Sequence, residues 1–248
     1  MTDTFSFPLT ARSVPFFADL EKIDSTNSFL SRSDLGAAYS VVLSTQQTAG
    51  RGRKNRQWMS HPGESLAVSI LVPRAESALL VDSWIPLLVG TAFVDTLTHL
   101  GVENVGLKWP NDVLVGGKKL AGVLCEAQPD GEVVAGVGIN LRFSGPPPTP
   151  QAASLGEIMK FRADTPDIVT STLITFLKGL LKAEAAEKQH RVGAVMLTVG
   201  RQVEVLEATG GRWIGLAERL DSEGHLVVRD EAGVRHVLAA VDVEHLYQ

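Results

Sequence analysis

The sequence lacks the residues needed for a disulfide within the chain and lacks an uninterrupted apolar segment long enough to span a membrane. There is one cysteine among 248 residues, Cys125, so no disulfide can form within the chain, and such sparse cysteine is typical of a reducing cytoplasm. The longest apolar stretch, residues 78–94, is interrupted by polar residues and a proline, which excludes a bilayer span. Residues 1–15 lack the sustained apolar core of a signal peptide. We therefore expect a cytoplasmic protein with no membrane partner.

Positive charge is also scarce, and this limits the classes of partner. The chain carries 23 lysines and arginines against 28 aspartates and glutamates, which gives a formal net charge of -5. An acidic balance is unsuited to coating nucleic acid, and residues 1–15 leave no room for a DNA-reading helix-turn-helix module. The six histidines are scattered without metal-ligand spacing, and no GxxxxGK phosphate loop occurs. The sequence thus predicts no DNA partner.

Against this acidic background, residues 46–58 form a strongly basic segment. Four cations fall within six residues, at Arg51, Arg53, Lys54 and Arg56. No acidic residue occurs between Asp34 and Glu64, so no sequence neighbour neutralises them. Gly50 and Gly52 allow a sharp turn, and arginine forks match phosphate and carboxylate oxygens. The segment is either a loop that closes over a compact anion such as a nucleotide, or a solvated hairpin that keeps a sheet edge soluble.

Hydrophobic periodicity predicts an α+β chain. Strands are expected where β-branched and apolar residues run between turn signals, at residues 39–44, 65–72, 105–109, 113–115, 120–127 and 133–141. Amphipathic helices are expected over residues 86–101 and from residue 165, and a helix start at residues 24–27. The strands from 105 to 141 form an antiparallel meander, whose glycines leave grooves where a ligand can lie against the backbone. Residues 1–15 are expected to be irregular.

From Gly200 onward the sequence changes to short apolar runs separated by turn signals. The predicted strands are residues 203–205, 213–216, 226–228 and 234–238. This spacing is typical of a small β-barrel or sandwich of about fifty residues, which is near the lower limit for an independent core. We therefore predict a main domain over residues 1–199 and a small β-domain over residues 200–248 that docks on it.

Several short motifs with polar or cationic residues follow one another along the main domain. They are Ser25-Thr26-Asn27, Gly50-Arg51-Gly52-Arg53, Lys108-Trp109-Pro110-Asn111-Asp112 with Lys119-Leu120-Ala121-Gly122, and Gly136-Val137-Gly138-Ile139-Asn140. Their order and spacing closely resemble biotin–protein ligases (biotin–acetyl-CoA-carboxylase ligases) from about residue 24 to the C-terminus. The resemblance implies an α+β, class II synthetase-like catalytic fold, with a central mixed, largely antiparallel sheet flanked by helices. It also implies a C-terminal SH3-like β-barrel domain.

A two-step reaction is a further implication of the resemblance. The biotin carboxylate attacks the α-phosphate of ATP, with Mg²⁺ as the expected metal ion, and gives biotinyl-5′-AMP and pyrophosphate. A lysine of a biotin carboxyl carrier domain then takes the biotin and releases AMP. Bifunctional relatives carry an N-terminal DNA-binding domain, for which residues 1–15 leave no room, so ligase activity alone is expected. Exposed sheet edges serve dimerisation in the family, which leaves a homodimer open.

The resemblance also assigns roles to individual residues. Because an anionic carboxylate must approach an anionic phosphate, cations aimed at the developing charge are required, and the implied catalytic residues are Lys119, Arg53 and Arg51. The implied biotin-binding residues are Ser25, Thr26, Asn27, Gln47, Arg51, Gly52, Arg53, Lys119, Gly122, Leu124 and Gly138. The implied ATP-binding residues are Arg51, Arg56, Trp58, Lys108, Trp109, Asn111 and Asn140. Asp112 either helps to place Mg²⁺ or caps its turn, and Trp109 either contacts ATP or belongs to the core.

Two other functions stay open beside the ligase. A lipoate/octanoate–protein ligase-type acyl transferase shares the fold but lacks this combination of motifs. A non-catalytic biotin-binding protein would need the pocket but not the cations at Lys119, Arg51 and Arg53. A DNA-binding regulator is disfavoured by the acidic balance.

Overall fold

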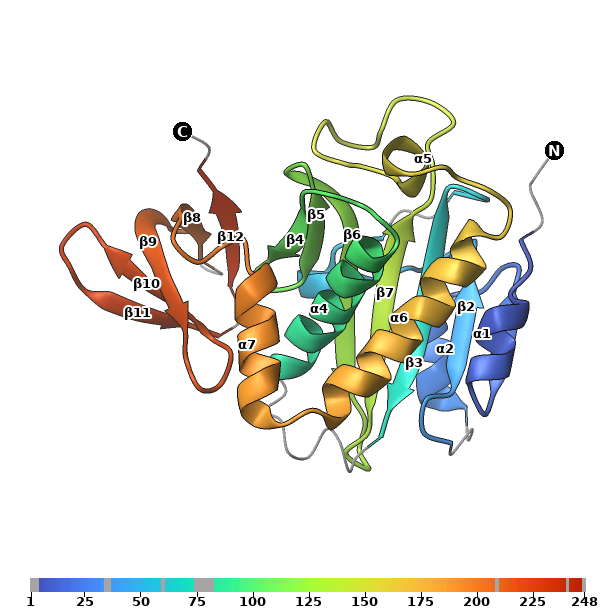
Figure 1. The fold of residues 1–248 in the computed structure, drawn as a ribbon. Helices are drawn as coiled ribbons and strands as arrows, with labels where there is room; N and C mark the ends of the chain where they lie inside the picture. Colours follow the sequence, from blue (N-terminus) through green and yellow to red (C-terminus); the bar gives the residue numbers. More distant parts are fainter. Residues whose placement is uncertain are drawn as a thin grey trace.

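The described strands of the protein form two β-sheets (Figure 1). The computed structural model describes residues 5–33, 37–58, 61–73, 83–207, 210–239 and 241–246. The larger sheet has seven strands in the order β1-β2-β3-β7-β6-β5-β4. They are β1 (Phe17–Leu20), β2 (Val41–Ser44), β3 (Ser65–Val72), β4 (Val105–Lys108), β5 (Asp112–Val115), β6 (Lys118–Ala127) and β7 (Val133–Asn140). β1 and β2 run parallel and the other neighbours run antiparallel, which confirms the predicted mixed sheet.

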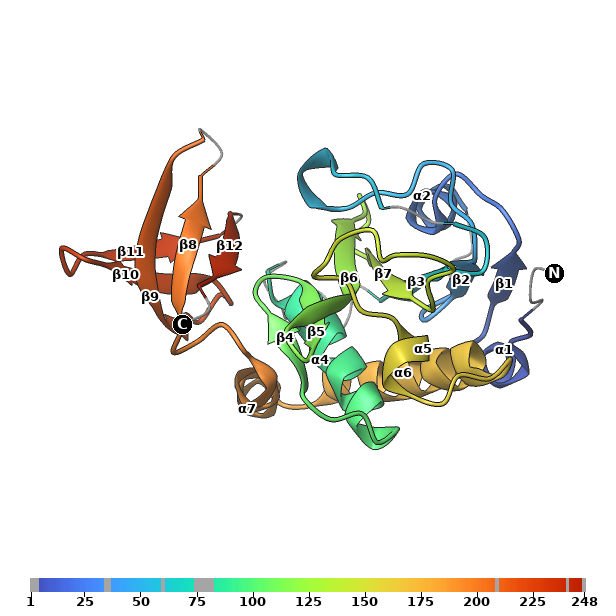
Figure 2. The ribbon, with the colours of Figure 1, turned by 90° about the horizontal axis from the view of Figure 1, so that it is seen from above.

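Helices cover both faces of the large sheet (Figure 2). On one face lie α4 (Trp84–His99), α6 (Thr165–Lys182) and α7 (Ala185–Val195); on the other lies α2 (Thr26–Arg32), and α5 (Leu155–Ile158) is a single turn at one end. Gly90 lets α4 approach β4 closely, because a Cβ there would lie 2.5 Å from Leu107 Cδ1. The helices predicted from residues 86 and 165 are confirmed. Among the described helices, none has the length and apolar character that a bilayer span requires, and residues 78–82 lie outside the described part.

The expectation of an irregular N-terminal segment is wrong, because α1 (Pro8–Ser13) is helical and packs against α6. The Asp167 carboxylate of α6 accepts the backbone N–H groups of Leu9 and Thr10, each at 2.9 Å, and so satisfies two donors at the start of α1. This contact joins residues 157 positions apart, and a search for local helix signals cannot find it. Residues 1–4 lie outside the described part of the chain.

The small C-terminal sheet has five strands in the order β11-β10-β9-β8-β12. They are β8 (Gln202–Leu206), β9 (Arg212–Leu220), β10 (Leu226–Asp230), β11 (Arg235–Leu238) and β12 (Asp242–His245). All neighbouring pairs run antiparallel. The predicted small C-terminal β-structure is therefore confirmed, while the domain boundary between residues 199 and 200 stays a prediction.

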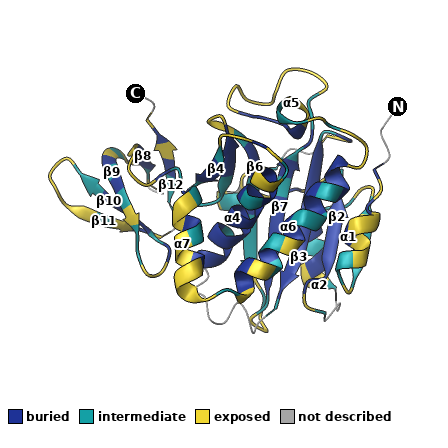
Figure 3. Ribbon diagram, in the orientation of Figure 1, coloured by how far each residue is buried: buried dark blue, intermediate teal, exposed yellow. Residues whose placement is uncertain are grey.

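Two tryptophans of the main domain dock the small sheet. Trp84 Nε1 donates to the carbonyl oxygen of Ser222 at 2.9 Å, and Trp109 Nε1 donates to that of Gly224 at 3.2 Å. Both acceptors lie in the turn between β9 and β10. Figure 3 shows the buried strands of the large sheet beside the more exposed outer strands of the small one. This docking fixes the position of β12, which faces the site described next.

Candidate active site

A pocket lies between the large sheet and strand β12 of the small sheet. Its lining includes every predicted site residue except Asn140, namely Ser25, Thr26, Asn27, Gln47, Arg51, Gly52, Arg53, Arg56, Trp58, Lys108, Trp109, Asn111, Asp112, Lys119, Gly122, Leu124 and Gly138. Strands β8 and β12 add Leu206, Asp242, Val243 and Glu244, which were not predicted. The motifs converge because β6 and β7 are neighbours, and because the start of α2 hydrogen-bonds to the basic segment across the chain.

A buried hydrogen-bond network holds the start of α2 at one end of the pocket. Ser25 is the N-cap residue, and its side chain accepts from the backbone N–H of Ser28 at 3.4 Å. Gln47 Oε1 accepts from the backbone N–H of Thr26 at 2.8 Å and from its hydroxyl at 3.2 Å. The Ser69 hydroxyl lies 2.8 Å from Thr26 Oγ1. Ser69 was not predicted, although a fully buried serine within the apolar strand 65–72 is the kind of signal that points to such a role.

Asn27 connects this network to a carboxylate that the sequence analysis missed. Its Nδ2 donates to Leu124 O at 3.1 Å and to Glu126 Oε2 at 2.7 Å, and its Oδ1 accepts from the Ser69 hydroxyl at 2.6 Å. Arg51 Nη2 lies 3.0 Å from the same Glu126 oxygen. Both amide hydrogens of Asn27 are therefore in use, and in this arrangement Asn27 and Glu126 together position Arg51.

Glycines form the floor of the pocket, and Trp58 lies on it. A Cβ at Gly138 would lie 2.5 Å from Trp58 Cε2, and one at Gly122 would lie 3.5 Å from Trp58 Cζ3. The ammonium group of Lys119 lies 6.0 Å from the centre of the Trp58 ring. The indole N–H of Trp58 is buried and has no hydrogen-bond partner among the described residues. Because glycines have no side chain, Gly122 on β6 and Gly138 on β7 leave space for a flat group against the backbone.

Two lysines flank Asp112 at the inner end of the pocket. Asp112 Oδ1 lies 2.7 Å from Lys119 Nζ. Burial lowers the pKa of Lys108, and the carboxylates of Asp112 and Glu244 act in the opposite direction. Because two ammonium groups share this region with Asp112, it suits an anionic ligand such as a phosphate.

The basic segment folds as a tight hairpin above the floor. Arg51 and Gln57 form a β-bridge, and the Gly52 N–H donates to Arg56 O at 2.7 Å. The cations at its tip, Arg53, Lys54 and Arg56, all form ion pairs with the carboxylate of Asp242 on β12. This contact was not predicted, because 186 positions separate Arg56 from Asp242.

Three of the predicted ATP-binding residues donate side-chain hydrogen bonds to backbone carbonyl oxygens of the protein. Trp109 is 2% exposed and its indole N–H donates to Gly224 O, which agrees with the prediction that it belongs to the core. It also lines the pocket. Asn111 donates to Val123 O at 2.7 Å. Asn140 lies outside the pocket lining and donates to Lys119 O at 3.3 Å and Ala153 O at 2.9 Å, which ties the start of β6 in place. Their contact with ATP stays a prediction.

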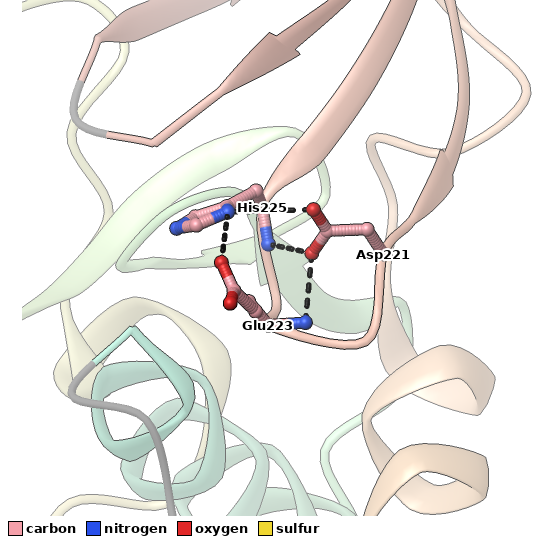
Figure 4. A group of neighbouring side chains, drawn as sticks. All are labelled: Asp221, Glu223 and His225. Atoms are coloured by element: carbon pink, nitrogen blue, oxygen red, sulfur yellow. Dashed lines mark hydrogen bonds and ion pairs between the residues drawn. The ribbon is translucent and has the colours of Figure 1, made fainter.

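A second cluster of titratable side chains lies in the turn between β9 and β10 (Figure 4). The possible ligand atoms of Asp221, Glu223 and His225 lie within 4.8 Å of one another. Asp221 Oδ1 accepts the backbone N–H groups of Glu223 and His225, each at 2.9 Å. His225 Nδ1 lies 3.3 Å from Asp221 and 3.4 Å from Glu223. These bonds stabilise the turn that docks on Trp84 and Trp109, and this structural role explains why the three side chains lie together.

The pocket gathers several lysines and arginines and is suited to anionic substrates. The chain belongs to the biotin/lipoate A/B protein ligase family, whose model matches residues 20–144.

Biotin ligases are among the relatives that match most of the chain. The chain is 34% identical over 231 residues to the biotin–acetyl-CoA-carboxylase ligase of Mycobacterium tuberculosis, covering 90% of this chain and 86% of that protein. It is 28% identical to the ligase of the same name from Paracoccus denitrificans, covering 90% of this chain and 98% of that one. Among solved structures, the biotin protein ligase of Aquifex aeolicus in complex with biotin and ATP superposes with a TM-score of 0.79 at 26% identity, covering 94% of this chain and 100% of that one. The predicted resemblance to biotin–protein ligases is confirmed.

Proposed function

We propose that this protein activates biotin with ATP and transfers it to a lysine of a biotin carboxyl carrier domain. The observation that carries the proposal is the convergence of Lys119, Arg51 and Arg53 on one pocket with a glycine floor. Two relatives support the choice of substrates. The Aquifex aeolicus ligase was solved with biotin and ATP, and the Mycobacterium tuberculosis relative is named for acetyl-CoA carboxylase.

In the first step, a carboxylate oxygen of biotin forms a bond to the α-phosphorus of ATP while the bond to pyrophosphate breaks. Repulsion between the two anions opposes this step, so cations already in place lower its barrier. Lys119 and Arg53 offset the charge that develops on the phosphate, with Arg51 beside them. The polar groups of Ser25, Thr26 and Gln47 fix the ureido ring against the apolar wall of the pocket.

In the second step, the neutral amine of the carrier lysine attacks the acyl carbon of biotinyl-5′-AMP. The carbon–oxygen bond to AMP breaks, AMP leaves as an anion, and the amine releases a proton to solvent. The intermediate is open to hydrolysis, so a hairpin that covers it protects it from water. The hairpin of residues 51–57 lies at the pocket and is suited to this.

Asp112 fits the role of a magnesium ligand. Mg²⁺ commonly binds through one or two carboxylates together with substrate phosphates, and Asp112 lines the pocket beside two lysines. When bound, the ion would neutralise phosphate charge. The ion pair of Asp112 with Lys119 supports a second role, which is to orient the ammonium group.

The single cysteine supports a cytoplasmic location for this activity. Homodimer formation and the absence of a DNA partner stay predictions.

Purified protein with Mg²⁺ and ATP should catalyse biotin-dependent ATP–pyrophosphate exchange and add the mass of one biotin to a carrier domain. Lipoate in place of biotin serves as the comparison. Faster exchange with lipoate would favour the acyl transferase alternative. Tight biotin binding without exchange would favour a non-catalytic binding protein.

A further inference from the structure

Asp242 is the point where the small sheet meets the basic hairpin. Its carboxylate lies 3.6 Å from Arg53 Nη1 and 3.5 Å from Lys54 Nζ, and it also pairs with Arg56. The Asp242 side chain is 14% exposed and lines the pocket. One carboxylate from the C-terminal strand β12 therefore holds three cations of the main domain.

The charges around this contact are unequal. The hairpin has no acidic sequence neighbour between Asp34 and Glu64, and Glu126 pairs with Arg51 rather than with the tip. Asp112 also acts on Arg53, but two carboxylates still carry less charge than the three tip cations. Phosphate oxygens carry more charge than a carboxylate and match guanidinium forks closely. A phosphate-bearing ligand in this pocket would compete with Asp242 for the same cations.

The same hairpin also controls the glycine floor. Trp58 follows the hairpin directly and its backbone N–H donates to Gly50 O at 3.0 Å. Its indole occupies the space above Gly138. A ligand that lies against this floor must displace the indole. Trp58 thus places one wall of the binding site next to the hairpin that Asp242 holds.

We propose that Asp242 is an internal anion that latches the basic hairpin over the pocket, and that the phosphates of a nucleoside triphosphate displace it. The identity of the displacing ligand rests on the proposed function. The latch makes triphosphate binding weaker than the bare cations would allow, because the Asp242 ion pairs must break first. It also makes the C-terminal sheet part of the substrate-binding site.

Asp242→Asn tests the latch, because it removes the negative charge and keeps the shape. Binding of inorganic tripolyphosphate, measured by calorimetry at low salt, should tighten about five-fold, which corresponds to about 1 kcal/mol. The KM for ATP should fall by a similar factor. Damage to the fold would instead raise KM and lower kcat. Equal or weaker tripolyphosphate binding by the variant, or no binding by either protein, would overturn the proposal.

Glu218→Gln is the matched control. Glu218 lies in the same small sheet, pairs with Arg229 and Arg235, and has a side chain 19% exposed, but it does not line the pocket. This variant should bind tripolyphosphate as the wild type does. Lys54→Gln should reduce the effect of Asp242→Asn when the two are combined, because Lys54 is one of the latched cations. Additive effects would contradict a latch that acts through the hairpin.

Trypsin cleavage gives a readout that needs no ligand. The hairpin offers cleavage sites at Arg51, Arg53, Lys54 and Arg56. Cleavage there should be several-fold faster in Asp242→Asn than in the wild type or Glu218→Gln, and equal rates would contradict the latch. Neither this assay nor tripolyphosphate binding depends on turnover. Absence of biotin-dependent exchange in the wild type would therefore refute the proposed function without deciding the latch.

Discussion

The ammonium group of Lys119 lies 2.7 Å from Oδ1 of Asp112, and the two residues come from the neighbouring strands β6 and β5. The carboxylate holds the lysine at the inner end of the pocket, close to the glycine floor and to Trp58. A flexible side chain that is oriented before the substrate arrives loses less entropy on binding. The pair therefore links the KWPND motif to the KLAG motif in space as well as in sequence.

Replacing Asp112 by Asn should raise the Mg²⁺ concentration needed for half-maximal exchange several-fold, because the proposed carboxylate ligand is lost. Exchange rates measured over a series of Mg²⁺ concentrations at saturating ATP check this. An unchanged Mg²⁺ requirement, together with a lower rate at every concentration, would show that Asp112 acts through Lys119 and not through the metal ion.

Gly138→Ala should raise the KM for biotin at least ten-fold, which corresponds to about 1.4 kcal/mol. The added Cβ would lie 2.5 Å from the present position of Trp58 Cε2 and would occupy the floor. The Trp58 ring must move to admit this Cβ, so the free energy of unfolding should also fall by about 1 to 3 kcal/mol, and urea denaturation measures this loss separately. Gly145→Ala is the control, since no atom lies within 4 Å of its Cβ position. Equal KM values for the two variants would mean that biotin does not lie on this floor.

Ser69→Ala should lower the free energy of unfolding by about 2 kcal/mol and weaken biotin binding. The change leaves Asn27 Oδ1 without its buried donor and removes the hydroxyl that contacts Thr26 Oγ1. Urea denaturation and biotin titration measure the two effects. Ser171→Ala removes a hydroxyl that bonds to Ile168 O within α6, and should cost less than about 0.5 kcal/mol. A loss of stability with normal biotin affinity would mean that the hydrogen bonds of Ser69 stabilise the fold but do not contribute to biotin binding.

Acid should destabilise the protein partly through His245. Burial and, to a smaller extent, the charges of Lys108 and Arg201 together lower the pKa of His245 to about 4. Its Nε2 lies 2.9 Å from Thr198 Oγ1, which also accepts from the Trp109 N–H. The unfolded chain, with a histidine pKa near 6.5, binds the proton first. The stability due to neutral His245 is therefore complete above about pH 6.5 and is lost as pH falls toward 4.

His245→Asn tests this dependence. Between pH 7 and 5 the wild type should lose roughly 1 kcal/mol more of its unfolding free energy than the variant, after allowance for the solvent-exposed part of the ring. Urea denaturation at several pH values provides the comparison. Parallel curves for the two proteins would exclude His245 as the source.

Features that depend on residues close together in the sequence could be predicted from it. The motifs around Thr26, Arg53, Lys119 and Gly138 each carry a turn, a cation or a glycine pattern of their own, and the structure brings them to one pocket. The strands of the meander were also predicted, because β-branched runs alternate there with glycine turns.

The remaining features depend on contacts between distant segments. The cap of α1 by Asp167, the bond between Asn27 and Glu126, and the latch of Asp242 on the hairpin join residues that are far apart in the chain. An isolated acidic residue on a strand gives no local indication of its partner. Such contacts are decided by the packing of complete elements, and no window of sequence contains both members.

The proposed charge stabilisation by Lys119 during biotin activation can be tested by comparing three proteins. Biotin-dependent ATP–pyrophosphate exchange should be measured for the wild type, Lys119→Ala and Lys118→Ala. Lys118 is the adjacent residue on β6, but it is exposed and does not line the pocket. We predict that Lys119→Ala lowers kcat about 100- to 1,000-fold, or roughly 3 to 4 kcal/mol, and that Lys118→Ala stays within two-fold of the wild type. Equal activity of the two variants would contradict the account.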